Sequence, residues 1–500
     1  MQNLKNKFVF LCALCVSVVN VFAQEMPPAP SAPKSVKVPA VSERKLPNGL
    51  TVAVVERKGV PLVTIQLLVK SGASAENSSK AGLANLTASM LTKGTKTRSA
   101  TQIAEAVEFL GGSINSGAGW NSSFISVTVT SDKVEQALAI MADAVLNPKF
   151  DQKELDLLKS QTLDGLAYNL KQPSFLANYV ASKYSFGEHP AGGTPASIGS
   201  ITQADIVAFH NVNFQPDNSA LIFSGEITYD AAAKASTLAF SSWNAGKEKT
   251  IISTGSPQNL PVTHLPNLNN LTVLSSSAPP MAINRMIVLD LPKSGQAAVT
   301  YAKPVSFVGR HSDSYYSAIV LNTVLGGGYS SRLNLEIRVK RGLSYGAGSS
   351  FAWRDSRSNF ATRTQTKNES AAEVVELVLA EIRKLSDASV GNDELVPRKS
   401  VLTGNFGRNL ETTAGLANEV GVLYAFSIPT GELNSYVSNV TGVTDAQIKS
   451  FGSQNLMGGD IIIVGDYTVF KDDLAKRFPN IKVDVIKAAE LDLSKDNLRK

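Results

Sequence analysis

Cysteine is almost absent from this sequence of 500 residues. The chain has two cysteines, Cys12 and Cys15, and both lie within the first 23 residues. Without that segment the chain has no disulfide, no thiolate metal ligand and no cysteine nucleophile.

Histidine and clustered positive charge are also scarce. No two of the four histidines stand three to five residues apart, which excludes the paired-ligand spacing of a helical zinc site. The net charge is +6 and falls to +4 when Lys5 and Lys7 are removed with the N-terminal segment. No block of lysine and arginine of the kind that follows a phosphate backbone is present, which argues against a nucleic-acid partner.

Only the N-terminus carries a long apolar run. Lys5 and Lys7 precede "FVFLCALCVSVVNVF", and Ala23 supplies a small residue at a cleavage site. We interpret residues 1–23 as a secretory signal peptide rather than a buried helix, and residues 24–41, rich in proline, as a tether. The cysteines lack the small-residue context of a lipoprotein site. The sequence therefore predicts an exported protein without a membrane anchor, in a bacterial periplasm.

Three motifs of the first half return in the same order in the second half. "ELDLLKS" (154–160) returns as "ELVPRKS", "ITQADIVAF" (201–209) as "VTDAQIKSF" and "ALIFSGEIT" (220–228) as "DIIIVGDYT", each 240 to 242 residues later. This spacing predicts a duplicated domain, at residues 42–254 and 281–500, joined by a linker at 255–280. Each half mixes helices and strands irregularly, so we expect an α+β fold whose largely antiparallel sheet is covered by helices on one face.

The stretch "AGLANLTASMLTKGT" (81–95) has the apolar spacing of a helix that ends at Gly94. Asn85 and Ser89 lie one turn apart on one face. No residue before Lys93 carries a charge or a titratable group. The sequence alone leaves open whether this is an ordinary core helix or a catalytic helix that has lost its chemistry.

A second stretch, "LGGGYSSRLNLEIRVKRGLSYGAGSS" (325–350), is rich in glycine but lacks the lysine of a phosphate loop. We expect Gly326, Gly327 and Gly328 to form a flexible loop whose backbone can approach an extended partner. Arg338 and Tyr345 could together donate hydrogen bonds to one carbonyl oxygen and its developing charge. The alternative is a helix end with a surface arginine and a half-buried tyrosine.

These motifs resemble the M16 metallopeptidases, the insulinase or pitrilysin family, whose members include mitochondrial processing peptidase. "GGGYSSRLNLEIRVKRGLSY" resembles the signature of their C-terminal domain, and "LPNGLTVAVVER", "FGEHPAGGTPASIGSIT" and "FQPDNSALIFSGEI" match in order. The resemblance implies two LuxS/MPP-like domains that form half of a clam-shell. It also implies that the inverted zinc motif His-x-x-Glu-His of active members falls on Asn85, Ala88 and Ser89.

None of these three positions keeps its functional residue. The family's third ligand, a glutamate, falls near Asp164 or Gly165, where no equivalent is evident. An amide and a hydroxyl are poor zinc ligands, and without the glutamate at position 88 no base is placed to activate water. We therefore expect this chain to bind no metal or other cofactor and to be inactive alone as a peptidase.

Three hypotheses remain for the function of such a chain. The first is a non-catalytic subunit that pairs with a zinc-bearing M16 peptidase, with Arg338 and Tyr345 acting on peptide substrate in the partner's active site and Gly326 to Gly328 contacting that substrate. The second is a structural subunit, and the third is a peptide-binding module that does not cut. The intact Arg338 and Tyr345 pair favours the first.

Overall fold

The computed structural model describes residues 37–244 and 283–500. The predicted signal peptide (1–23), most of the predicted tether and the predicted linker (255–280) lie outside the described residues. Within the described ranges, no helix combines the length and the apolar character needed to cross a membrane.

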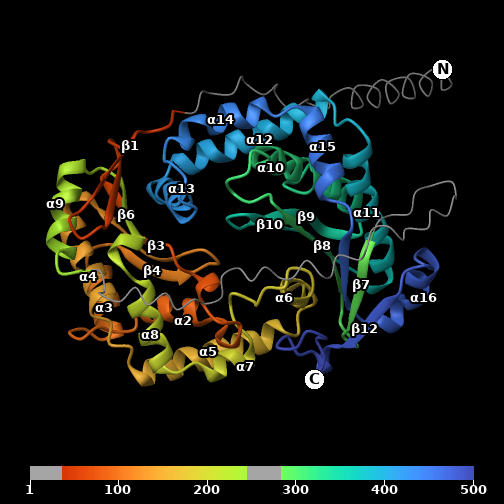
Figure 1. Cartoon of the computed structure of the whole chain (residues 1–500), viewed down its shortest axis with the longest axis horizontal. Helices are drawn as coiled ribbons and strands as arrows, with labels where there is room; N and C mark the ends of the chain where they lie inside the picture. The colour runs from red at the N-terminus through yellow and green to blue at the C-terminus, as the bar shows by residue number, and fades with distance from the viewer. Residues whose placement is uncertain (1–36, 245–282) are drawn as a thin grey trace, which may run out of the picture. The chain divides into compact units, whose positions relative to one another are not determined.

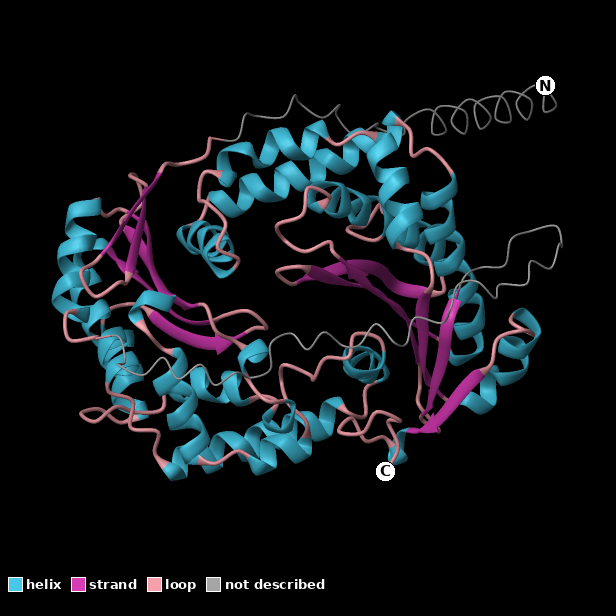
Figure 2. Ribbon diagram, in the orientation of Figure 1, coloured by secondary structure: helices cyan, strands magenta, loops and turns pink. Residues whose placement is uncertain are grey.

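The first described range contains six strands and eight α-helices, with short 3₁₀ turns between them (Figures 1 and 2). In chain order they are β1 (Val41–Lys45), β2 (Thr51–Glu56), β3 (Leu62–Val69), α2 (Leu83–Met90), α3 (Ala100–Phe109), β4 (Ser113–Ala118), β5 (Ser123–Thr130), α4 (Val134–Leu146), α5 (Gln152–Asn169), α6 (Pro173–Tyr184), α7 (Pro195–Ser200), α8 (Gln203–Asn213), β6 (Ser219–Gly225) and α9 (Tyr229–Phe240).

The second described range likewise contains strands and α-helices, and it has one π-helix in addition. Its elements are β7 (Ile283–Asp290), β8 (Ala297–Ser306), α10 (Tyr315–Leu325), the π-helix (Asn334–Lys340), β9 (Ser344–Trp353), β10 (Arg357–Thr366), α11 (Ala371–Asp387), α12 (Asn392–Leu410), α13 (Thr413–Ala425), α14 (Glu432–Gly442), α15 (Asp445–Asn455), β11 (Gly459–Gly465), α16 (Tyr467–Arg477) and β12 (Val483–Lys487).

The two six-stranded sheets share one topology over five strands. Their orders are β1-β2-β6-β3-β5-β4 and β12-β7-β11-β8-β10-β9. In both, the second and third strands are parallel and the next three pairings are antiparallel. The sixth strand differs: β1 pairs antiparallel with β2, whereas β12 pairs parallel with β7. The predicted fold class is confirmed, since antiparallel pairings outnumber parallel ones in both sheets.

The repeated motifs occupy equivalent elements. The first repeat lies on α5 and α12, the second on α8 and α15, and the third on β6 and β11. The turn at Pro47-Asn48-Gly49 joins β1 to β2, and Gly49 adopts a φ of 93° that a residue with a Cβ rarely adopts.

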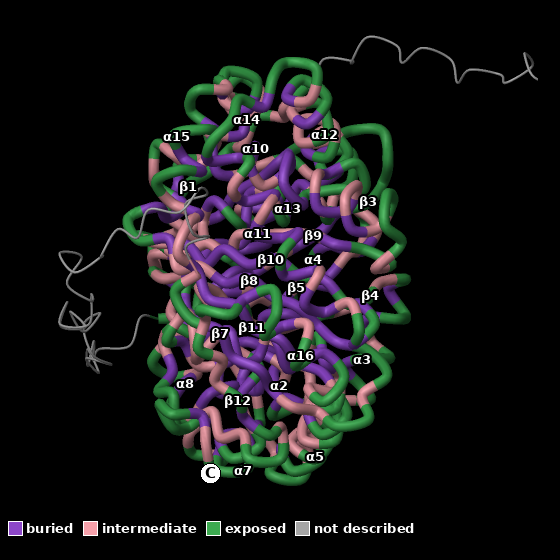
Figure 3. The backbone as a smooth tube through the Cα atoms, turned by 90° about the vertical axis from the view of Figure 1, so that its right-hand side faces the viewer, coloured by how far each residue is buried: buried purple, intermediate pink, exposed green. Residues whose placement is uncertain are grey.

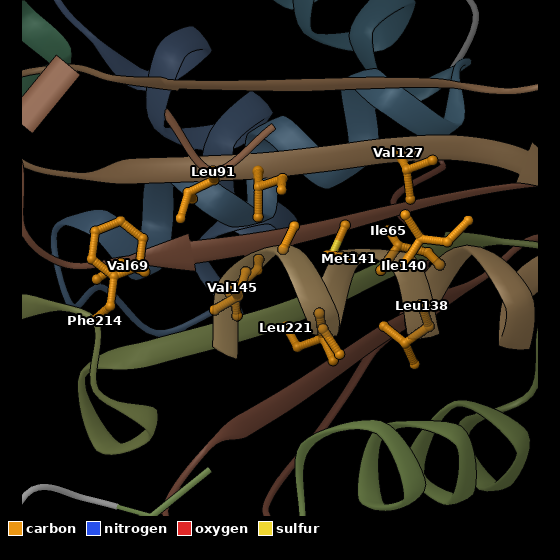
Figure 4. Packing of buried hydrophobic residues seen from close by; sticks show 14 of the residues in the cluster. Ile65, Val69, Leu91, Val127, Leu138, Ile140, Met141, Val145, Phe214 and Leu221 are labelled. Atoms are coloured by element: carbon orange, nitrogen blue, oxygen red, sulfur yellow. The ribbon is translucent and has the colours of Figure 1, made fainter. Parts of the chain in front are cut away.

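Each half has an apolar core between its sheet and its own helices. Alternate residues of β3 and β5, including Ile65 and Val127, point to the helices, and Leu138 and Met141 of α4 meet them (Figure 4). The central strands β6 and β11 are buried along their whole length, whereas β1, β4 and β9 are largely intermediate or exposed (Figure 3). Each such fully buried aliphatic side chain stabilises the fold by roughly 1.5–3 kcal/mol.

The opposite face of each sheet is covered by a helix from the other half (Figure 1). On the first sheet, α13 packs against β3 and β6: a Cβ on Gly421 would lie 3.5 Å from Leu68, and the hydroxyls of Thr64 and Thr413 are 2.8 Å apart. On the second sheet, α6 buries Leu176 and Val180 in a cluster with residues of β7, β8, β11 and β12. The expectation of helices on one face was therefore incomplete, because the halves exchange helices.

The helix expected to end at Gly94 ends instead at Met90. Residues beyond it enter isolated strand-like bridges, Gly94 with Ser99 and Thr95 with Pro148, and Gly94 has a φ of 128°. One local and one long-range pairing therefore hold the backbone at Gly94 and Thr95 in a non-helical conformation.

His210 in α8 is expected to make the stability of the fold depend on pH. Its Nε2 lies 2.9 Å from the Val145 carbonyl oxygen, and its ring lies between Phe150 and Phe214. Burial lowers the pKa of His210 below its ordinary value. The unfolded chain, with a histidine pKa of about 6.5, then binds a proton more readily than the folded chain. Stability is therefore expected to be lost as the pH falls below about 6.5.

Urea unfolding at pH 7.5 and 5.5 tests this expectation against His210→Gln, whose amide can still donate to Val145. The native chain is expected to lose more stability between the two pH values than the variant does. Equal losses would contradict the assignment.

Candidate functional site

The three positions that the family resemblance assigns to the zinc motif, Asn85, Ala88 and Ser89, lie on α2, next to the edge strand β4. Asn85 is half-buried, and its Oδ1 accepts a hydrogen bond of 3.4 Å from the backbone N–H of Ala118 in β4. Ala88 is fully buried, and Ser89 is half-buried. The helix therefore keeps the one-sided burial expected from its sequence, and Asn85 contacts the sheet edge.

The residues near the family's third ligand do not complete a metal site. Asp164 and Gly165 lie on α5, and both are exposed. The described residues contain no group of three or more histidine, cysteine, aspartate or glutamate side chains placed to hold a metal ion. An amide, a methyl group and a hydroxyl at positions 85, 88 and 89 do not fit Zn²⁺, which takes imidazole, thiolate or carboxylate ligands.

A buried carboxylate that sequence reasoning missed holds the N-terminus of α2. Glu76 accepts hydrogen bonds from the backbone N–H groups of Gly82 (2.8 Å) and Ala84 (2.7 Å), and His189 Nε2 lies 3.1 Å from its Oε1. A negative charge at a helix N-terminus is stabilising because it satisfies free N–H groups and complements the helix dipole. The partners of Glu76 stand 6, 8 and 113 residues away, so no short motif marks them.

The Gly-rich loop, residues 326–332, packs closely against neighbouring elements at its first two glycines. A Cβ on Gly326 would lie 2.3 Å from Ser349 N in β9, and one on Gly327 would lie 2.7 Å from the Cα of Thr323. Only Gly328 has open space around it. Gly326 therefore lies against the chain's own strand β9 and Gly327 against α10, so the close approach expected of this backbone is made within the chain at these two glycines. Contact of this loop with a substrate stays a prediction.

Arg338 lies on the π-helix, and its guanidinium carbon sits 5.0 Å from the centroid of the Tyr329 ring. Among the described residues it makes no ion pair with a carboxylate. The nearby Glu336 is engaged elsewhere: hydrogen bonds from Lys340 and Arg341 lower the pKa of Glu336 and hold its carboxylate. The guanidinium donors of Arg338 are therefore available to a second molecule.

Tyr345 lies on the edge strand β9, and 92% of the residue is exposed. The alternative of a half-buried tyrosine was therefore wrong. No hydrogen bond joins Tyr345 to Arg338 within the described residues. The structure places both on consecutive elements, the π-helix and β9, with the phenol free to reach a second molecule.

A charged network links the two halves of the chain through Glu188. This residue is 5% exposed and follows α6, and it binds Arg354 (2.6 Å), Arg357 (2.8 Å) and Asn359 (3.0 Å) of the second half. The Arg354 guanidinium also lies over the ring of Trp120. No short motif in the sequence marks this network, because the partners of Glu188 stand 166, 169 and 171 residues away from it.

Two family models match this chain in succession. Residues 51–184 match insulinase (peptidase family M16), and residues 200–400 match the peptidase M16 inactive domain. Together the matches cover more than half of the sequence, and the chain belongs to the M16 peptidase family.

Proteins of similar sequence occur in other bacteria. An uncharacterized zinc protease of Rickettsia felis is 26% identical over 403 residues, which cover 79% of this chain and 91% of that protein. An uncharacterized zinc protease of Bacillus subtilis, YmxG, is 23% identical over 370 residues, which cover 73% of this chain and 83% of that protein.

Two solved structures are similar in fold. A peptidase M16 inactive domain from Pseudomonas fluorescens superposes with a TM-score of 0.72 at 24% identity, covering 85% of this chain and 98% of that one. A protease from Helicobacter pylori superposes with a TM-score of 0.76 at 18% identity, covering 86% and 100%.

Proposed function

We propose that this chain is the non-catalytic subunit of an exported, heterodimeric M16 zinc peptidase. One observation carries the proposal: α2 keeps its fold while offering Asn85, Ala88 and Ser89 in place of zinc ligands and base, and Arg338 and Tyr345 keep their donors free. A chain with no peptidase role has no need of such donors. A zinc-bearing M16 partner would supply the metal that polarises the peptide carbonyl and activates water.

In such a complex, the residues of this chain would stabilise the transition state alongside the metal of the partner. The Tyr345 hydroxyl would donate a hydrogen bond to the oxygen that becomes negative as the tetrahedral intermediate forms. The Arg338 guanidinium, with donors in a planar fork, would hold a neighbouring substrate carbonyl in place. Gly328 leaves room for an extended peptide to pass close to the loop.

Export to the periplasm is part of the same proposal. The N-terminal segment of the sequence supports it, and so does the confinement of both cysteines to that segment, since an exported chain without other thiols cannot form unwanted disulfides.

Purification of the tagged chain from its native host tests the proposal. We expect a second M16 chain with an intact His-x-x-Glu-His motif to co-elute, and zinc and peptide hydrolysis to follow the complex. The mature chain produced alone is the control, and we expect it to cleave no oligopeptide.

The result that would overturn the proposal is tight, stoichiometric zinc and unaided peptide hydrolysis by the isolated chain. A complex that contains a zinc-bearing partner and binds peptide, but whose turnover does not depend on this chain, would point instead to a structural or peptide-binding role.

A further inference from the structure

Helix α12 holds the Gly-rich loop through two separate contacts. Arg398 donates hydrogen bonds to both the hydroxyl and the carbonyl oxygen of Ser330. Glu394 forms a two-pronged ion pair with Arg332, with Arg332 Nε 3.1 Å from both carboxylate oxygens and Nη2 2.7 Å from Oε2. The contacts flank Ser331, which is fully buried and donates to the Gly328 carbonyl.

The two α12 residues stand one helical turn apart, so they face the loop from the same side. Arg398 is only 8% exposed, and its Nε has no hydrogen-bond partner among the described residues. A buried donor left without a partner costs free energy. The two terminal nitrogens of the Arg398 guanidinium donate to Ser330, and these hydrogen bonds offset the cost of the unpartnered Nε.

The duplicated half lacks this arrangement. In the first copy of the repeat, on α5, Glu154 matches Glu394, but Leu158 takes the place of Arg398. A helix whose task was only to pack would be served by leucine in both copies. The buried arginine is therefore specific to the half that carries the Gly-rich loop.

The loop in turn sets the surroundings of Arg338. Tyr329 lies within it, between the glycines and the residues held by α12, and its carbonyl oxygen accepts a hydrogen bond from Asn334 Nδ2 on the π-helix. The ring of Tyr329 lies beneath the Arg338 guanidinium. Cation–π contact is directional, because the cation is attracted to the face of the ring. A shift of the loop therefore turns or releases the guanidinium.

We propose that Arg398 and Glu394 are positioning residues for Arg338, which they orient through the Gly-rich loop and the ring of Tyr329. Neither touches the substrate. The inference rests on the proposed function and adds two residues, and the aromatic support Tyr329, to the machinery that acts on the peptide.

A double-mutant cycle in the complex with the zinc-bearing partner tests this inference. Arg398→Met is expected to lower kcat/KM by about tenfold or more, since a misplaced group far from the chemistry can cost up to a hundredfold. In the Arg338→Ala background the same substitution is expected to change kcat/KM less than twofold, because residues that act through one group are not additive. Arg408→Met, an exposed position on the same helix, is the matched control and is expected to leave kcat/KM unchanged.

Amide hydrogen exchange on the isolated chain gives a readout that does not depend on the partner. Arg398→Met and the milder Glu394→Gln are both expected to speed exchange of residues 326–332 at least tenfold, with exchange in β10 unchanged. If Arg398→Met does not fold, Glu394→Gln replaces it in the cycle.

The outcomes separate the two proposals. If Arg338→Ala leaves turnover unchanged, the proposed function itself fails. If Arg338→Ala lowers turnover but Arg398→Met reduces it equally in both backgrounds, only the positioning role is overturned. Unchanged exchange in the loop would overturn it as well.

Discussion

Replacement of Tyr345 by phenylalanine is expected to lower the kcat of the proposed heterodimeric complex by about two to three orders of magnitude. Loss of one donor to the oxyanion of an acyl-transfer transition state typically has this effect, equivalent to about 3–4 kcal/mol. The ring stays in place, so the change removes only the hydroxyl. KM is expected to change little, because the hydrogen bond strengthens as charge develops on the oxygen. Steady-state hydrolysis of a fluorogenic peptide measures both constants.

Because Tyr345 is exposed, this substitution is expected to change turnover without changing stability. With 92% of the residue open to solvent, the substitution removes no packing and is expected to leave the unfolding midpoint within experimental error. Tyr168→Phe, at another exposed tyrosine on α5, is the matched control. Equal turnover of the Tyr345→Phe and control complexes would remove Tyr345 from the catalytic machinery.

Replacement of Glu188 by alanine is expected to destabilise the chain by about 3–5 kcal/mol. Removal of one partner from a buried ion pair leaves the remaining charge without compensation, and here two arginines and an amide lose their common acceptor. The midpoint of urea unfolding measures the loss, which is expected to far exceed that of an exposed ion pair, about 0–1 kcal/mol.

Glu108→Ala, at an exposed glutamate of α3, is the control for loss of a negative charge, and we expect it to be nearly neutral. Arg357→Ala, which removes the more exposed of the two cations, should have an intermediate effect, since Arg354 still pairs with the carboxylate. A Glu188→Ala midpoint equal to that of Glu108→Ala would show that the network contributes nothing to stability.

The sequence sufficed to predict the duplicated fold, because the repeats carry the core pattern. The third repeat becomes β6 and β11, two fully buried central strands, and the second becomes helices α8 and α15, whose capping threonines, Thr202 and Thr444, occupy the same place in the motif. Local chemistry of this kind is visible in a window of ten residues. The exchange of α6 and α13 between the halves could not be predicted in this way, because the apolar face of a helix does not indicate which of the two sheets it packs against.

The candidate site likewise has one part that the sequence predicts and one part that it does not. The predicted loss of zinc ligands on α2 needs only the residue identities at Asn85, Ala88 and Ser89, which the sequence prints directly. The support of the site could not: Glu76, Glu188 and Arg398 are charged residues whose burial arises only from tertiary contacts. The packing of Gly326 and Gly327 against the chain's own elements could not be predicted from the sequence either. Glycine permits both flexibility and close packing, and only the neighbouring strand decides between them.

The exchanged helices α6 and α13 also limit how far the chain can fold while it is being synthesised. When the first half leaves the ribosome, the face of its sheet formed by β3 and β6 has no cover until α13, more than 180 residues later, has been made. The sheet of the second half likewise needs α6 to cover one face, and α6 belongs to the first half, which is synthesised earlier. Neither half can reach its final state before the other exists, so acquisition of the native state is a single event of the finished polypeptide, and a truncated product would present bare apolar strands to the quality-control machinery.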